Sequence, residues 1–187
     1  MNEKCEMFLK QIGANENIYS YFSNAKLEKI IASTNKENYL FIITIENTLP
    51  IDVYKSINIC LKETFKDIKS KKIQYNVINK NYDLLNDYYK NLIEIYCQEN
   101  SHFLSFVDTN CVLNDLVLTI EVSNIAEKNI LLSREEEILK YFKLCGFADL
   151  KLEINIVKEE VSIEDFVVID EDRLKNIDQV KPQPEFK

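Results

Sequence analysis

Two stretches of alternating apolar and polar residues flank a helical pattern late in the chain. Every second residue from 116 to 122 is aliphatic, which suits a strand with one buried face. The alternation resumes over residues 150–157. Between them, Gly146 follows a run at helical spacing and suits a helix C-cap, and that run comprises Leu131, Ile138, Phe142 and Cys145. The pattern therefore predicts a strand, one long helix and a second strand.

A similar order of patterns occurs earlier in the chain. Residues 1–13 are typical of a short helix that ends at Gly13, and Asn15 can cap a second one carrying Ile18, Tyr21 and Phe22. Strands are predicted over residues 26–33 and 39–45, as a hairpin, and over residues 72–78. Pro50 announces the helix between them, whose predicted buried stripe is Val53, Tyr54, Ile57, Leu61 and Phe65.

The second half begins with a predicted helix over residues 83–98. Ser101 can cap a short helix holding Phe103, Leu104 and Val107, and residues 111–113 form a weak strand before a turn at Asn114-Asp115. The fold class is therefore α+β, with two tandem ααββαβ modules at residues 1–80 and 81–158. Identity between the two copies is slight, so a true repeat and a chance recurrence of the order both remain open.

The last residues of the chain differ in composition. Residues 159–187 are strongly acidic and end with Pro182 and Pro184, a composition typical of a linker. We expect this linker to lead into a longer protein.

Charge and cysteine usage narrow the function classes. The chain of 187 residues has a formal net charge of -8, and its one clear basic cluster is Lys69, Lys71 and Lys72, which suits a solvated turn. Direct nucleic-acid binding is therefore expected to be weak or absent. Five dispersed cysteines indicate reduced thiols, and from the charged N-terminal residues and the lack of a long apolar run we expect neither a signal peptide nor a membrane span. We expect a soluble cytoplasmic protein without membrane contact.

The sequence contains no standard catalytic constellation. Two isolated glycines exclude phosphate-binding loops and a GxxG loop, and the cysteine spacing excludes a zinc site. His102 could form a dyad with Cys97 or Cys111, but it suits a helix start better. Glu135, Glu136 and Glu137 suit the first turn of a helix capped by Ser133 better than a cation site. We expect no catalytic residue, metal or cofactor.

Aromatic residues supply the candidate binding positions. The chain has ten Tyr, ten Phe and no Trp, and most of them follow core-facing spacing. Tyr19, Tyr88 and Tyr89 are the candidates for exposed contacts, with half-burial as the alternative.

Three segments resemble the N-terminal region of PolC, the replicative DNA polymerase III alpha subunit of low-GC Gram-positive bacteria. They are YFSNAKLEKIIAS (21–33), LPIDVYKSINICLKETFKDI (49–68) and LKYFKLCGFADLKLEINI (139–156). The most specific motifs are GF-x-DL (Gly146, Phe147, Asp149 and Leu150) and LP-x-x-x-Y (Leu49, Pro50 and Tyr54). The resemblance covers about residues 18–158 in matching order.

The resemblance implies modules similar to the C-terminal domain of the clamp-loader tau subunit and to the N-terminal domain of the initiator DnaA, both with a KH-like outline. In the family this region precedes an OB-fold, a PHP domain with a 3'-5' exonuclease, and the DNA-directed DNA polymerase core. No catalytic residue can be carried over to this chain. The implied partners are the tau subunit and the rest of the polymerase chain.

Three functional hypotheses follow. The first is a non-catalytic region that tethers a replicative polymerase to the tau subunit. The second is a KH-like nucleic-acid-binding module using Lys26, Lys29, Lys69, Lys71 and Lys72. The third is a small hydrolase using a cysteine and His102.

Overall fold

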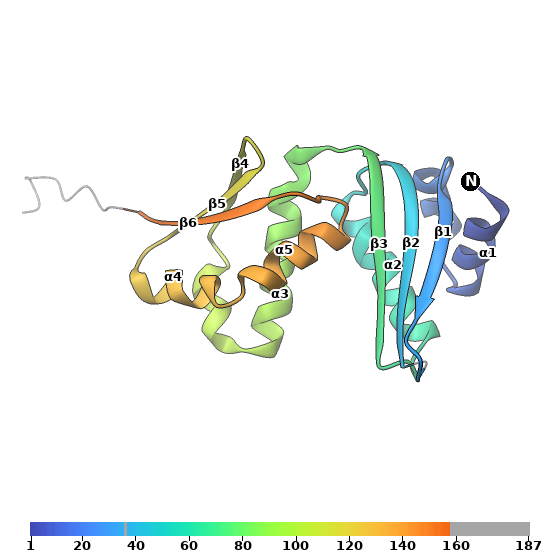
Figure 1. Cartoon of the computed structure of the whole chain (residues 1–187), viewed down its shortest axis with the longest axis horizontal. Helices are drawn as coiled ribbons and strands as arrows, with labels where there is room; N and C mark the ends of the chain where they lie inside the picture. The colour runs from blue at the N-terminus through green and yellow to red at the C-terminus, as the bar shows by residue number, and fades with distance from the viewer. Residues whose placement is uncertain (36, 158–187) are drawn as a thin grey trace, which may run out of the picture. The chain divides into compact units, whose positions relative to one another are not determined.

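Two separate three-stranded sheets, each covered by helices, make up the described chain. The computed structural model describes residues 1–35 and 37–157, and Met1–Val157 form one unit (Figure 1). This arrangement confirms the predicted α+β class with two small α+β modules. The predicted module boundaries stay a prediction, and the expected linker at residues 159–187 lies outside the described residues.

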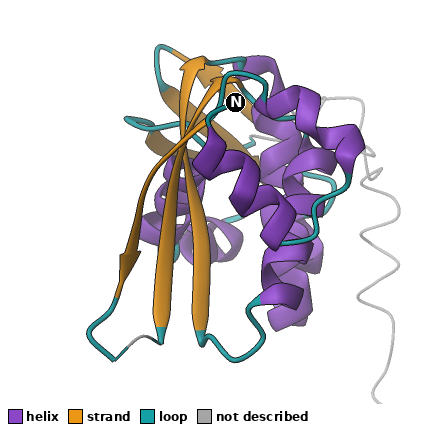
Figure 2. Cartoon of the chain, turned by 90° about the vertical axis from the view of Figure 1, so that its right-hand side faces the viewer, coloured by secondary structure: helices purple, strands orange, loops and turns teal. Residues whose placement is uncertain are grey.

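The first sheet has the strand order β1-β2-β3 and contains both kinds of strand pairing. β1 (Lys26–Ala32) and β2 (Asn38–Asn47) are antiparallel, as the predicted hairpin requires, whereas β2 and β3 (Ser70–Asn79) are parallel. The parallel pair needs a crossover, which α2 (Ile51–Thr64) supplies. Figure 2 shows the strands side by side with helices on one side of them.

Alternation along β2 and β3 separates a face buried in the first core from a more open face, on which Ile42 is nevertheless only 8% exposed. Phe41, Ile43 and Ile45 of β2 are buried, and so are Ile73, Tyr75 and Val77 of β3. Two N-terminal helices, α1 (Glu3–Gln11) and the 3-10 helix η1 (Glu16–Phe22), pack on this face together with α2. Asn2 and Asn15 cap them by accepting hydrogen bonds from the main-chain N–H groups of Cys5 and Asn17.

The second sheet repeats the strand order of the first. β4 (Cys111–Asn114) and β5 (Val117–Val122) are antiparallel, and β5 and β6 (Lys151–Ile156) are parallel. The helices of this half are η2 (Tyr82–Leu84), α3 (Leu85–Glu99), η3 (Ser101–Phe106), α4 (Ile125–Leu132) and α5 (Glu135–Leu144). Their buried side chains form a second hydrophobic core with Leu118, Ile120 and Ile154.

The predicted long helix of the second half is wrong, because the structure contains two helices. α4 ends at Leu132 and α5 begins at Glu135. Ser133 does not cap α5: it follows the end of α4, and its hydroxyl donates a 2.6 Å hydrogen bond to the Ile130 carbonyl. The Ser133 side chain therefore serves the last turn of α4, and it accepts no hydrogen bond from an N–H group of α5 in the described chain.

Two further local predictions are displaced along the chain. The turn before β5 uses Asp115 and Leu116, both with positive φ (47° and 64°), instead of Asn114 and Asp115. Asn100, not Ser101, caps η3 by accepting from the His102 N–H at 2.9 Å. Among the apolar residues predicted for the two short helices, Tyr21, Leu104 and Val107 are exposed.

Candidate protein-interaction surface

Aromatic side chains from both halves of the chain meet around Tyr54. Its ring centroid lies 6.1 Å from that of Tyr75 on β3, 5.2 Å from that of Tyr88 on α3 and 6.3 Å from that of Tyr141 on α5. Burial raises the pKa of Tyr54, Tyr88 and Tyr141, and it raises the pKa of the nearby Cys145 thiol to about 12. These groups are therefore neutral packing elements near pH 7. We call the four tyrosines, Tyr54, Tyr75, Tyr88 and Tyr141, the tyrosine junction.

One buried and one partly buried hydrogen bond orient side chains of the tyrosine junction. The Tyr88 hydroxyl donates to the Leu49 carbonyl at 2.8 Å, and the Asn91 amide donates to the Tyr141 hydroxyl at 2.7 Å. The Tyr75 hydroxyl is buried with no hydrogen-bond partner in the described chain. Packing and hydrogen bonding together hold α3 and α5 against the first half.

Gly146 allows the end of α5 to approach β3 closely. Its φ is +102°, and a Cβ atom built there would clash with the side chain of Val77. The predicted role of Gly146 after a helix is therefore correct, and the close approach to β3 is a second reason for glycine at this position.

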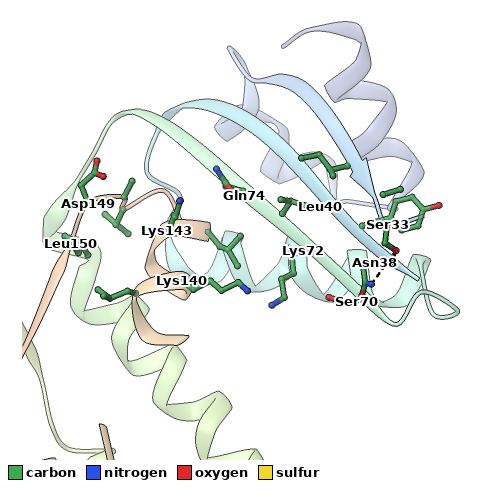
Figure 3. A pocket seen from close by; sticks show the side chains of 17 residues that line it. Ser33, Asn38, Leu40, Ser70, Lys72, Gln74, Lys140, Lys143, Asp149 and Leu150 are labelled. Carbon is green, nitrogen blue, oxygen red and sulfur yellow. Dashed lines mark hydrogen bonds between the residues drawn. The ribbon is translucent and has the colours of Figure 1, made fainter. Parts of the chain in front are cut away.

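An open groove of about 850 Å³ lies between the first sheet and α5 with its following turn (Figure 3). We call it the sheet groove. Its walls include aliphatic side chains of both halves, among them Ile31, Leu40, Leu139 and Leu150. The charged residues lining it are Lys72, Lys140, Lys143 and Asp149, so the described lining has a net positive charge.

A second hollow of about 740 Å³, the helix groove, lies beside the sheet groove and is lined by residues of α2, β3, α3 and α5. It shares Lys72, Lys140 and Leu144 with the sheet groove. Ile59 and Ile95 line it and are 56% and 37% exposed, which leaves apolar surface available to a partner.

The contacts of three of the five lysines proposed for nucleic-acid binding show whether their charges are available to a ligand. Lys26 forms an ion pair with Glu28 at 2.9 Å. The Lys71 ammonium donates to the Phe65 and Ile68 carbonyls beyond α2, which is a structural role. Lys72 alone of the five lines the sheet groove. The lysines at the groove on α5, Lys140 and Lys143, were not singled out from the sequence, because only the fold brings them near β3.

The tyrosines predicted as exposed contacts have different positions in the structure. Tyr88 and Tyr89 are 1% and 0% exposed, so their prediction as exposed contacts is wrong. α3 packs on more than one side: Tyr88 contacts the first half, and the Tyr89 hydroxyl lies 2.7 Å from the hydroxyl of Thr109. Tyr19 is half-buried against the first core, and a binding role for it stays a prediction.

The surroundings of the residues considered as catalytic or metal-binding candidates do not favour either role. His102 is exposed in η3, and burial raises the pKa of the Cys111 thiol to about 12, which disfavours the thiolate required of a nucleophile. Glu137 pairs with Arg134 at 2.6 Å. Over residues 1–35 and 37–157 there is no cluster of three metal-ligating side chains, and no helix is long and apolar enough to cross a membrane.

The fold and grooves describe an α+β unit with an open, lysine-bearing surface. In a comparison with known proteins, residues 5–75 match the family described as DNA polymerase III polC-type N-terminus I. The chain is also 29% identical over 168 residues to "DNA polymerase III PolC-type" of Oceanobacillus iheyensis (strain DSM 14371 / CIP 107618 / JCM 11309 / KCTC 3954 / HTE831), a match covering 87% of this chain. These findings confirm the resemblance to the PolC N-terminal region. The chain spans about 11% of the length of that relative.

The two motifs that carry the resemblance lie at the places just described. Leu49 and Tyr54 of LP-x-x-x-Y belong to the contact between the halves, where Leu49 accepts the hydrogen bond from Tyr88. Phe147, Asp149 and Leu150 of GF-x-DL line the sheet groove. One motif thus joins the two halves, and the other builds one wall of the groove.

Proposed function

We propose that this chain is the non-catalytic N-terminal protein-interaction region of a PolC-type replicative DNA polymerase. In this role it tethers the polymerase to the tau subunit of the clamp loader during DNA replication. The observation that carries the proposal is the similarity to a PolC-type polymerase over 168 residues, together with the polC-type N-terminus match at residues 5–75. The catalytic activity of the parent polymerase would belong to other parts of the protein.

The surface of the chain supports a protein partner. The sheet groove and the helix groove adjoin one another, and both combine aliphatic walls with lysines. Such a mixture of apolar area and rim charge is typical of protein interfaces. The acidic net charge of -8 disfavours a general affinity for nucleic acid.

Isothermal titration of the purified chain with full-length tau tests this function. We expect saturable binding with a negative heat-capacity change, because apolar surface is buried. An unrelated acidic protein of similar size serves as the control titrant. Absence of binding to full-length tau by both calorimetry and analytical ultracentrifugation would contradict the proposal.

A KH-like nucleic-acid-binding function is the second candidate. It is favoured by Lys72, Lys140 and Lys143, which lie around one groove and form no ion pair with another described residue. This function requires affinity for single strands that falls steeply with salt concentration. An electrophoretic shift assay with single-stranded DNA at low salt tests it, and the absence of any shift would remove it.

A further inference from the structure

We infer that the sheet groove binds an acidic peptide segment that carries aliphatic side chains. This inference deepens the proposed function, on which it rests, by naming the surface and the class of segment that a partner protein would present there.

The floor of the sheet groove comes from the open face of the first sheet. Strand register places Ile31, Leu40 and Lys72 in one row across β1, β2 and β3. Leu40 points away from the core because its neighbour Phe41 is buried in it. Ile31 is 45% exposed and Leu40 is half-buried, so apolar area remains uncovered in this row.

The opposite wall comes from α5 and the turn that follows it. Leu139 and Leu144 of α5 are half-buried, and Leu150 follows the turn. An aliphatic side chain entering between these leucines and the sheet would gain burial on both sides. The groove is therefore suited to a segment with Leu, Ile or Val side chains.

Three lysines give the groove its charge preference. Figure 3 shows the side chains of Lys72 and Lys140 extending toward one another from opposite walls. Lys72, Lys140 and Lys143 are exposed, and none of them forms an ion pair with a described residue. Asp149 is the single acidic residue among the described lining. Carboxylates of a bound segment would relieve the repulsion between the ammonium groups.

The aromatic residues of the groove favour a peptide over a single-stranded nucleic acid. Bases bind to exposed aromatic faces. Phe147 is only 1% exposed, and its ring contacts Tyr82, Tyr88 and Phe142. Tyr39 stacks on Phe41 and packs against the first core. Phe147 offers no free face and Tyr39 is half-buried with Phe41 stacked on its ring, whereas the aliphatic wall and the ammonium groups match an acidic, aliphatic peptide.

The test uses the full chain and a fluorescent peptide in which Leu and Ile alternate with Glu and Asp. Binding is measured by fluorescence polarisation for the unmodified chain and for a double variant, Lys72→Glu with Lys140→Glu. The matched control is Lys66→Glu with Lys90→Glu, two exposed lysines outside both grooves, which changes the net charge equally. We expect the groove variant to bind about tenfold or more weakly and the control variant to change by less than about twofold.

A second variant tests the aliphatic wall without changing charge. Leu40→Ser should weaken peptide binding while circular dichroism stays unchanged, because Leu40 lies outside the first core. If the groove variant and the control charge variant lost peptide affinity equally, net charge alone would explain the loss, and the inference would be overturned. Loss of oligo-dT binding in the groove variant, with peptide binding unaffected, would also overturn it.

Parallel titrations with tau separate this inference from the proposed function. If the chain binds tau but the groove variant binds it equally well, the groove assignment fails and the tether stands. If the peptide binds in the groove but tau does not bind the chain, the tether fails and the groove stands. Parallel loss of peptide and tau binding in the groove variant supports both.

Discussion

The hydroxyl group of Tyr88 donates a buried 2.8 Å hydrogen bond to the main-chain carbonyl of Leu49, 39 residues earlier in the chain. Leu49 directly precedes Pro50, the N-cap residue of α2, so this bond links the start of α2 to α3. The ring of Tyr88 also packs edge-on against Tyr54 of α2 and Phe147. A single side chain thus joins the two halves by both packing and hydrogen bonding.

Tyr88→Phe should lower the free energy of unfolding by about 1–3 kcal/mol, because it leaves the buried Leu49 carbonyl without its donor. Urea denaturation followed by circular dichroism measures the change. Tyr21→Phe is the control, since Tyr21 is 45% exposed and should change stability little. Equal losses in the two variants would contradict the assigned role of the Tyr88 hydroxyl.

Gly146→Ala should destabilise the protein more than Gly13→Ala. Both glycines have positive φ, +102° and +67°, so each substitution strains the backbone by about 1–2 kcal/mol. At Gly146 the new methyl group also meets Val77, which adds an overpacking cost of about 1–3 kcal/mol, whereas nothing lies within 4 Å of the built Cβ at Gly13. Thermal unfolding of the two variants compares them. If Gly13→Ala proved as destabilising as Gly146→Ala, or more so, this result would argue against the close approach of α5 to β3.

The ion pair between Lys55 of α2 and Glu94 of α3 should contribute little despite its 2.7 Å distance. Its side chains are 37% and 60% exposed, and such pairs contribute at most about 1 kcal/mol. A double-mutant cycle with Lys55→Ala and Glu94→Ala measures the coupling, which should shrink further in high salt. A coupling well above that limit would mean that the pair is shielded from solvent.

Stability should fall at alkaline pH. Burial raises the pKa of Tyr89 and Tyr96 to about 12 and of the Cys5 thiol to about 11. The folded protein therefore holds these protons more tightly than the unfolded chain, whose tyrosines ionise near pH 10. The stabilisation is fully present below the unfolded pKa values and is lost as the pH rises through the folded ones. Urea midpoints at pH 8 and pH 11 measure the loss, and equal midpoints would contradict it.

The five cysteines should separate into two reactivity classes toward Ellman's reagent. Cys60 and Cys97 are half-buried and should react first. Cys5, Cys111 and Cys145 are buried, and burial raises the pKa of each thiol, so they should react only when the chain opens. The double variant Cys60→Ser with Cys97→Ser should lose the fast phase. A fast phase that persists in this variant would mean that one of the other three thiols is accessible.

Local periodicity predicted most of the helices and strands because each one buries a regular stripe. The alternation of Ile73, Tyr75 and Val77 fixes β3, and the spacing of Val53, Ile57 and Leu61 fixes α2. The break between α4 and α5 was missed for the same reason. Leu131 and Ile138 are seven residues apart and both are buried, so they satisfy one continuous helix as well as two helices.

The candidate surface was largely outside the reach of sequence reasoning. Lys72 and Lys140 are 68 positions apart, and only tertiary packing places them around one groove. The burial of Tyr89 depends likewise on Thr109 and on the packing around α3. The GF-x-DL motif was the available signal, because three of its residues line the sheet groove.

The close approach of Gly146 to Val77 has a consequence for recombination between related sequences. Any size change at Val77 must be matched at the end of α5, so β3 and the end of α5 have to vary in concert. A chimaera that takes β3 and the end of α5 from different relatives can have mismatched side chains at this contact, whereas exchange of residues 1–157 as a block keeps the contact unchanged.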